Sequence, residues 1–338
     1  AHPTPNASGR DGAAEILSLA EQADEDTLIL FPLSGGGSAL LPLPAGDITL
    51  ADLQSLTDDL LASGASIDEI NTVRKHLSQI KGGQFAAAAA PATVVGLVLS
   101  DVVGNDVGVI ASGPIVGDDS TYQDAQSVLA TYDITPPATV EAHLTRGREK
   151  KIDETPPTGG SVFDHVDTHI LADATTATEA AVESAADTAF TPLLLSTRVE
   201  GEAREIGKVH AAIADEVADS GEPIEPPALL LSAGEATVTL SGDGLGGPNQ
   251  EFVLGGLLQS DVETVVIGSV DTDGEDGATD AAGAIAGPTT VENEHDAQAA
   301  LSENDTYDYF AERNGLIHTG PTGTNVNDLR ILAVTDQS

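Results

Sequence analysis

The stretch LILFPLSGGGSALLPLP, residues 28–44, is the clearest local pattern in the chain. Its opening apolar run is typical of a buried strand, and the run breaks at Pro32. The loop that follows consists of small residues, namely Ser34, Gly35, Gly36, Gly37 and Ser38. Glycines tolerate positive φ and a close approach of other groups. A helix that begins near Ser38 would point its free N–H groups and its positive dipole end at the same place. We therefore weigh an anion site, usually for phosphate, against a tight turn that binds nothing.

Strand and helix patterns alternate on both sides of this loop. Apolar runs typical of strands lie at 93–100, 167–172, 191–196, 228–233, 236–240, 264–270 and 329–334. Helical patterns lie at 11–22, 49–64, 66–80, 121–132, 174–189, 202–219 and 249–259, with two more before Arg313. This alternation predicts an α/β fold with a parallel sheet and helices on both faces. The Pro-rich segment SGEPIEPP at 220–227 favours a domain boundary, so we expect one domain over 1–222 and a smaller one over 223–338.

The charge balance of the chain is strongly acidic. Fifty-five aspartates and glutamates stand against 13 lysines and arginines, which gives a formal net charge of -42. Such a charge destabilises the compact state unless salt screens it. The acids are spread along the chain, which favours a high-salt cytosol over an acidic tail. Nucleic acid is not an expected partner, because its phosphates require a basic face.

Several kinds of chemistry are excluded by what the sequence lacks. It has no cysteine, so disulfides, thiolate chemistry and zinc–thiolate sites are ruled out. The motifs G-x-x-x-x-G-K-[ST] and G-x-S-x-G do not occur, and the histidines are not at metal-ligand spacing. No apolar run reaches the ~18 residues of a membrane helix, and the first residues show no signal-peptide pattern. We expect a soluble cytoplasmic protein without a membrane partner.

The acidic segment DTDGEDG, residues 271–277, follows a strand pattern. It is not an EF-hand loop, because Asp276 stands where that loop needs glycine and Ala282 where it needs glutamate. Mg²⁺ prefers one or two carboxylates together with substrate phosphates. Asp271 and Asp276 are therefore candidate metal ligands, and the alternative in so acidic a chain is ordinary surface charge.

Two further loops are rich in glycine or hydroxyl groups. Residues 319–328, TGPTGTNVND, carry no charge before the final aspartate, and their hydroxyls, amides and glycine N–H groups suit phosphate or sugar oxygens. Residues 242–247, GDGLGG, match the dinucleotide fingerprint G-x-G-x-x-G. One match is weak evidence, and here it follows two closely spaced strand patterns instead of opening a first βαβ unit. A nicotinamide oxidoreductase is therefore the weakest function considered, and a turn that borders a ligand cleft is the alternative.

Taken in order, several motifs resemble one known family. They are HPTP (2–5), SGGGSALLPLP (34–44), VRKHLSQIKGG (73–83), SDVVGNDVGVIASGP (100–114), SAGEATV (232–238), GLGGPNQE (244–251), DTDGEDGATDAAGA (271–284) and TGPTGTNVNDL (319–329). Together they resemble the ATP-dependent glycerate 2-kinases, whose C-terminal domain is called MOFRL. The resemblance extends through essentially the whole chain.

The resemblance implies transfer of the ATP γ-phosphate to the 2-hydroxyl of D-glycerate, with Mg²⁺ as cofactor. It implies a Rossmann-like N-terminal domain and a smaller MOFRL-type α/β domain, with the active site in the cleft between them. By motif position, the loop Ser34 to Ser38 holds phosphate or the substrate carboxylate. The catalytic candidates are Lys75, Lys81, Asp101 and Glu251. The other candidates are Asn249, Thr322, Thr324, Asn325 and Asn327 for substrate, and Asp271 and Asp276 for the metal. The expected partners are ATP and D-glycerate, and we also consider a homodimer.

Two departures from the family pattern bear on activity. Family members begin with a further segment that holds a strand and a G-x-G-K-A turn, and its lysine is a catalytic candidate. This chain starts at the His-Pro motif, so we expect that lysine to be missing. The family motif G-G-R-N-Q-E reads GGPNQE over 246–251, with Pro248 in place of the arginine. Phosphoryl transfer depends on cationic groups that stabilise spreading negative charge, so we consider both an impaired kinase and an inactive relative that binds nucleotide or a metabolite.

Overall fold

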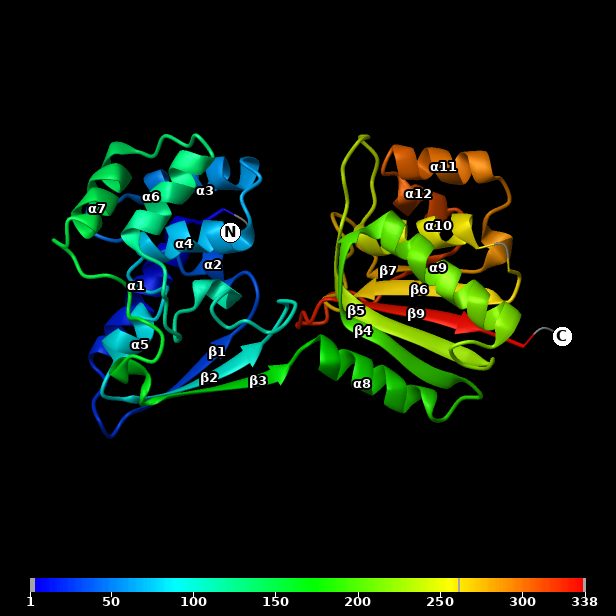
Figure 1. Ribbon diagram of the computed structural model, residues 1–338, viewed down its shortest axis with the longest axis horizontal. Helices are drawn as coiled ribbons and strands as arrows, with labels where there is room; N and C mark the ends of the chain where they lie inside the picture. The colour runs from blue at the N-terminus through cyan, green and yellow to red at the C-terminus, as the bar shows by residue number, and fades with distance from the viewer. Residues whose placement is uncertain (1–3, 261, 337–338) are drawn as a thin grey trace. The chain divides into compact units, whose positions relative to one another are not determined.

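The computed structural model describes residues 4–260 and 262–336 of the chain (Figure 1). His2 and Pro3 of the HPTP motif lie outside the described residues. The chain forms two compact units, Ala1–Leu171 and Ala172–Ser338. None of the helices in the described residues combines the length and the apolar character that crossing a membrane requires.

The first unit is built on a three-stranded sheet. Its strands are β1 (Leu28–Leu33), β2 (Thr93–Leu99) and β3 (Val166–Ala172), paired in the order β1-β2-β3. β1 and β2 run parallel, with Leu28 opposite Thr93, so their carboxyl ends lie at the same edge. Open α/β sheets place ligands at this edge, and here it carries the loop after β1 and Asp101 after β2.

The helices of the first unit pack in two groups. They are α1 (Ala7–Glu21), α2 (Gly37–Leu40), α3 (Leu50–Ala62), α4 (Ile67–His76), α5 (Gln84–Ala89), α6 (Tyr122–Thr131) and α7 (Ala138–Arg148), with 3₁₀ turns Ile110–Ser112 and Ser161–Phe163. α1 and α5 share an apolar cluster with β1 and β2, whereas α3, α4, α6 and α7 share a second one. Capping boxes, Thr49–Asp52 and Ser66–Glu69, stand at the start of α3 and α4. The second cluster holds α4 in place, and α4 carries Arg74 and Lys75 in its last turn.

The second unit is built on a six-stranded mixed sheet. Its strands are β4 (Thr191–Glu202), β5 (Ala228–Thr237), β6 (Val265–Asp271), β7 (Gly283–Ala286), β8 (Leu316–Ile317) and β9 (Asp328–Val334), paired in the order β4-β5-β9-β6-β7-β8. Its helices are α8 (Ala174–Ala185), α9 (Ala203–Ser220), α10 (Pro248–Gln259), α11 (Glu294–Ser302) and α12 (Thr306–Ala311), with a 3₁₀ turn Pro288–Thr290. α9 and α10 cover one face of the sheet, and α8 lies against the other (Figure 1). The core of this unit forms between the sheet and the α9–α10 pair.

The position of β9 decides which loops meet in the second unit. β9 lies between β5 and β6 and runs antiparallel to both. Asp328 at its start pairs with Gly234 in β5 and with Asp271 at the end of β6. The loop that leads into β9 and the loop that leaves β6 therefore meet at one edge of the sheet.

The two compact units divide at a different place from the boundary expected from the sequence. The Pro-rich segment predicts a boundary at 222–223, whereas the units meet between Leu171 and Ala172. The expected strand 191–196 and helix 202–219 are β4 and α9, and they lie in the second unit. β4 belongs there because it pairs in parallel with β5, and α9 because it packs against α10. The Pro-rich segment 220–227 thus connects α9 to β5 inside one unit.

Strand direction and the shortest elements also differ from expectation. The parallel pattern holds for β1–β2 and β4–β5, but β9 and β7 run antiparallel to their neighbours. An apolar run indicates a buried strand and carries no information on its direction. A single strand, β5, contains the expected strand 228–233 and the first two residues of the expected strand 236–240, whereas 238–240 lie outside any strand. β7 and β8, with 4 and 2 residues, are too short to show a period.

Candidate functional site

The glycine loop, residues 34–38, joins the carboxyl end of β1 to α2. Gly36 has a φ of 74°, a left-handed conformation that favours glycine. α2 begins at Gly37, which confirms the expected helix start near Ser38. A Cβ atom at Gly35 would lie 1.7 Å from Oδ2 of Asp101, so the missing side chain lets this carboxylate lie against the loop. The fold thus brings together the glycine loop and Asp101, both of which are predicted site residues.

Hydroxyl and amide groups link the glycine loop to two neighbouring segments. The hydroxyls of Ser38 and Ser112 are hydrogen-bonded, and Ser112 Oγ donates to Asn71 Oδ1 at 2.8 Å. Ala111 and Ser112 have φ values of 50° and 60°. Such values cost energy for residues other than glycine, and they persist where the surrounding structure enforces them, often at functional sites. The segment around Ser112 is therefore held in a strained form against the glycine loop.

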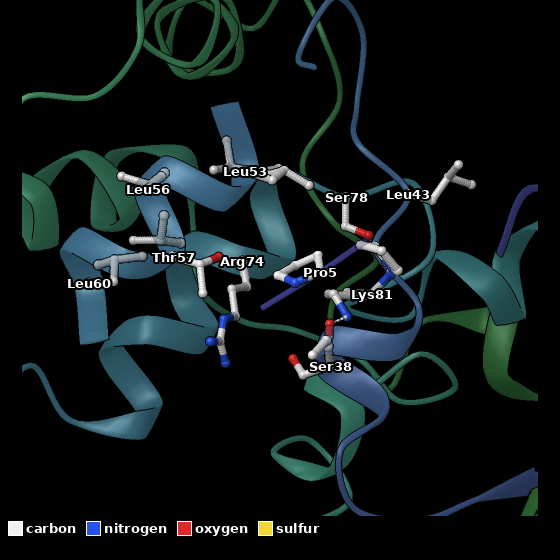
Figure 2. A pocket seen from close by; sticks show the side chains of 14 residues that line it. Pro5, Ser38, Leu43, Leu53, Leu56, Thr57, Leu60, Arg74, Ser78 and Lys81 are labelled. Carbon is white, nitrogen blue, oxygen red and sulfur yellow. Dashed lines mark hydrogen bonds between the residues drawn. The ribbon is translucent and has the colours of Figure 1, made fainter. Parts of the chain in front are cut away.

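Lys81 is the buried cation beside the glycine loop. It is 5% exposed, and its Nζ donates to the carbonyl oxygen of Ser38 at 2.8 Å (Figure 2). Burial and, to a lesser extent, the charge of Arg74 lower the pKa of Lys81 to about 7. Arg74 lines the same pocket as Ser38 and Lys81. We call the glycine loop with Arg74, Lys81, Asp101 and Ser112 the glycine-loop site.

Lys75 is placed differently from Lys81. Its Nζ lies 3.4 Å from Oδ1 of Asp118, which also accepts a hydrogen bond from Ser120 Oγ. The charge of Lys75 is therefore balanced by a carboxylate. It borders a second, polar pocket of about 290 Å³, together with Asn71. Because Asp118 balances its charge, Lys75 is less able than Lys81 to offset the charge of a bound anion. Its catalytic role stays a prediction.

In the second unit, two loops predicted separately lie side by side. Thr322 Oγ1 donates to the carbonyl of Thr272 at 2.6 Å, and Thr322 N donates to the carbonyl of Asp273 at 2.9 Å. Asn325 Nδ2 donates to Asp273 Oδ2 at 3.4 Å. Asn327 has a φ of 72° and its carbonyl accepts from Thr272 N. We call the loops 271–276 and 319–328 the aspartate-loop site. Thr324 lies within it, and its carbonyl accepts from Thr322 Oγ1.

Asp276 caps the start of α10. Its Oδ1 accepts from Asn249 N at 2.9 Å and from Asn249 Nδ2 at 3.2 Å, and its Oδ2 accepts from Gln250 N at 2.9 Å. A Cβ atom at Gly247 would collide with this carboxylate, so glycine is needed there. Asp276 is fully buried, and burial raises its pKa to about 6. With both oxygens engaged by the helix, Asp276 fits a structural cap better than the metal ligand that the sequence suggested.

Asn249 connects this cap to the sheet. Its Nδ2 donates to Asp328 Oδ1 at 2.7 Å, and its Oδ1 accepts from the hydroxyl of Ser269. Asp328 in turn forms an ion pair with the fully buried Arg330. Asn249 is 1% exposed and its amide is committed to neighbouring side chains. Asn249 thus holds α10 against β6 and β9, and its substrate-binding role stays a prediction.

Asp271 retains the features of a metal ligand. It is half-buried, and burial together with the charges of Asp273, Asp328 and Asp276 raises its pKa to about 7. A divalent cation would relieve this crowding of negative charge. No group of three or more His, Cys, Asp or Glu side chains suited to a metal occurs in the described part of the chain. Asp271 with Asp273 therefore fits Mg²⁺ that arrives with phosphate and water ligands, as Mg²⁺ prefers.

Glu251, expected as a catalytic residue, lies inside the packing of the second unit. It is 1% exposed, its Oε2 lies 2.8 Å from Nη2 of Arg204, and its Oε1 accepts from Asn304 Nδ2 at 2.7 Å. Burial raises its pKa. Glu251 thus ties α10 to α9 and to the segment before α12, and its catalytic role stays a prediction.

The fingerprint loop 242–247 is likewise engaged within the protein. Gly242 N donates to Asn304 Oδ1 at 3.0 Å, and Gly244 N donates to the carbonyl of Glu303 at 2.9 Å. Cβ atoms at Gly242 and Gly244 would lie 2.4 and 2.5 Å from residues of this segment. The glycines therefore serve close packing, and the N–H groups of Gly242 and Gly244 already have partners.

Arg74, Ser112 and Asp328 lie in motifs that the sequence marks, whereas Asn71 and Arg330 lie outside them. Asp328 and Arg330 start the final strand, so the polar loop before it was the available signal. Asn71 and Arg74 lie on α4, three residues apart, and Asn71 is buried despite its polar side chain. Nothing in the sequence places α4 against the glycine loop, because that contact is tertiary.

Two family models match the chain. The first, described as a domain of unknown function (DUF4147), matches residues 1–145, and the second, the MOFRL family, matches residues 228–328. The first match holds the glycine-loop site, and the second holds the aspartate-loop site.

Curated relatives and a solved structure match nearly the whole chain. A glycerate 2-kinase of Pyrococcus horikoshii is 42% identical over 344 residues, covering 99% of this chain and 77% of the relative. A protein of Agrobacterium vitis, provisionally named a hydroxypyruvate reductase, is 42% identical over 98% of this chain and 76% of its own. The crystal structure of a glycerate kinase from Thermotoga maritima aligns with a TM-score of 0.90 at 40% identity, covering 99% of this chain and 80% of the other.

Proposed function

Because the chain belongs to the glycerate 2-kinase family, we propose that it transfers the γ-phosphate of ATP to the 2-hydroxyl of D-glycerate. The observation that carries the proposal is the glycine-loop site. It places a buried lysine, a glycine turn and a carboxylate at the carboxyl ends of two parallel strands. Phosphoryl transfer needs this combination of positioning and positive charge.

Each part of the glycine-loop site has a role in the proposed reaction. The N–H groups of Gly35 to Ser38 bind anionic oxygens, as loops that open a helix do. Lys81 stabilises negative charge that spreads in the transition state. Asp101 lies against Gly35 and accepts the proton of the substrate hydroxyl, the role of the aspartate in kinase catalytic loops.

The aspartate-loop site supports the proposal that Mg²⁺ accompanies the nucleotide. Asp271 and Asp273 would hold the ion, and Mg²⁺ would supply charge neutralisation of the phosphates. The hydroxyls of Thr322 and Thr324 and the amide of Asn325 would hold phosphate or sugar oxygens. Asp276, Asn249 and Glu251 support this arrangement from inside the unit.

One relative carries the name of a reductase, which would require a nicotinamide site in this chain. The fingerprint loop 242–247 does not favour that function, because Gly242 N and Gly244 N are bonded to the segment around Asn304. Phosphoryl transfer remains the function that the sites support best.

The direct test is ADP release with D-glycerate and Mg²⁺ in molar KCl. We expect turnover that needs all of ATP, D-glycerate and Mg²⁺, and a product phosphorylated at the 2-hydroxyl by ³¹P NMR. Ligand-dependent thermal stabilisation without turnover would instead identify an inactive relative that only binds its ligands. If a Lys81→Ala variant turned over as fast as the unaltered chain, the catalytic role of Lys81 would be wrong.

A further inference from the structure

Arg74 and Lys81 are exceptional among the basic residues of this acidic chain. Neither forms an ion pair within the described residues, although Lys81 is buried and Arg74 half-buried. The other basic residues without an ion pair, Arg146, Arg148, Lys150 and Arg198, are exposed. The chain has 55 acidic residues, yet these two neighbouring cations have no carboxylate within ion-pair distance among the described residues. They therefore leave a local excess of positive charge. Removing charge from water in this way is costly unless an anion completes the site.

The pocket beside these two cations is built from polar groups on one side and apolar ones on the other. Its polar lining includes Ser38, Ser78, Arg74 and Lys81, and its apolar lining includes leucines of α3 and Leu77. Figure 2 shows the Arg74 side chain extending to the same side of the pocket as the Ser38 side chain, with the Lys81–Ser38 hydrogen bond nearby. The cavity volume is about 30 Å³, room for one or two oxygen-sized atoms.

We propose that Arg74 is the specificity-determining residue that binds the carboxylate of the substrate, with Lys81 behind it and the Ser38 hydroxyl beside it. The planar guanidinium group pairs with a carboxylate through two parallel hydrogen bonds. The small cavity volume suits a group of a few atoms, such as a carboxylate. This inference rests on the proposed function and adds which end of the substrate the pocket recognises.

The proposal separates Arg74 from its neighbours on α4. Lys75 is paired with Asp118, so it cannot supply the missing charge. A cation in the last turn of a helix is also favoured by the helix dipole, which is the structural alternative for Arg74. Arg148 in the last turn of α7 is exposed, so it is a matched control for that alternative.

The kinetic test compares Arg74→Gln, Arg74→Lys and Arg148→Gln with the unaltered chain in molar KCl. We expect Arg74→Gln to raise KM for D-glycerate by about 100-fold, the effect of removing one partner of a desolvated charge pair, with KM for ATP nearly unchanged. Arg74→Lys should recover part of the loss, and Arg148→Gln should change neither constant. An equal change in both KM values, or none in that for D-glycerate, would overturn the proposal. Melting curves establish that each variant is folded.

A binding experiment keeps this proposal separate from the kinase assignment. Calorimetric titration without ATP compares D-glycerate with glycerol, which has the same carbon skeleton and lacks the carboxylate. We expect the unaltered chain to prefer D-glycerate and Arg74→Gln to lose that preference. If preference and its loss are seen without any ADP release, the subsite stands and the kinase proposal fails. If turnover is seen but Arg74→Gln keeps the preference, the subsite is wrong and the kinase proposal stands.

Discussion

Lys81 has a buried amino group, and its described hydrogen-bond partner is the backbone carbonyl of Ser38. Such a group destabilises the folded state when charged. Nearby acidic side chains could have offset that cost, yet the chain, with a net charge of -42, places none within ion-pair distance among the described residues. Groups that cost stability and stay unpaired are typical of active sites.

We expect Lys81→Met to make the protein more stable and less active. At pH 7 the free energy of unfolding should rise by about 1–2 kcal/mol, and kcat/KM should fall by about 100-fold or more. Because the pKa of Lys81 is lowered from 10.5 to about 7 in the folded state, its cost is complete below pH 7. The cost then vanishes as pH rises toward 10.5, since the unfolded chain binds the extra proton in that window.

Denaturant unfolding in molar KCl across this pH range checks the Lys81 prediction. The gap between Lys81→Met and the unaltered chain should be widest at neutral pH and close at alkaline pH. A variant that is less stable at every pH would show that Lys81 is a structural residue.

Asp271 and Asp276 lie five positions apart but should respond to substitution in opposite ways. Asp276→Ala removes three hydrogen bonds at the start of α10 and should lower stability by about 2–3 kcal/mol. Asp271→Asn relieves crowding that raises its pKa to about 7, so stability above that pH should hold or rise. Asp271→Asn should instead raise the Mg²⁺ concentration needed for activity. The increase should exceed the ~10–100-fold typical of residues that lie outside the metal shell. Mg²⁺ titration of activity, with melting curves, separates the two; equal destabilisation by both would contradict the assignment.

Among the helices, α10 begins with a residue that departs from the family motif. Pro248 occupies its first position, where the fixed φ of proline suits the helix start. In the family pattern an arginine stands there. α10 is well capped by Asp276 and does not need the proline to begin.

We expect Pro248→Arg to increase the rate of phosphoryl transfer. An added cation at a transferring phosphate can gain ~10³–10⁵-fold in other systems, and we expect a gain of at least about 10-fold here. Stability should fall by only ~0.5–1 kcal/mol, because the proline restricts the unfolded chain. Steady-state kinetics of Pro248→Arg against Pro248→Ala checks this, since alanine removes the proline without adding charge. Equal activity of the two variants would speak against it.

For the molecule as a whole, the -42 formal charge dominates the conditions under which it folds. The Debye length is about 3 Å in 1 M salt and about 10 Å at 0.1 M. Diluting the salt therefore lets each surface carboxylate repel carboxylates that lie farther away. Self-repulsion then destabilises the compact state.

We expect the melting temperature to fall steadily as KCl is diluted from molar to millimolar concentrations. Sucrose at matched osmolality should not replace KCl, because it is excluded from the surface without screening charge. Scanning calorimetry in both series checks this. A melting temperature independent of KCl, or one that sucrose restores, would show that screening is not the cause.

Local patterns determined much of the fold in advance. The apolar run at Leu28, the glycines after it and the caps at Thr49 and Ser66 depend on contacts within a few residues, so their strands and helices could be read directly. The order of motifs also identified the family resemblance, because the residues of a motif do not depend on how the units pack. Strand direction and the place of division between the units could not be read, since both follow from which strand pairs with which.

Only part of the two candidate sites could be predicted from the sequence. Glycine turns, loop polarity and acidic runs marked the glycine loop, Asp271 and the 319–328 loop as candidate sites. Whether a carboxylate is free or committed depends on what packs against it, and only the tertiary structure showed that Asp276 caps α10 and Glu251 pairs with Arg204. The same reason explains Arg74, whose lack of an acidic partner among the described residues is a property of its three-dimensional surroundings and leaves no trace in its neighbours along the chain.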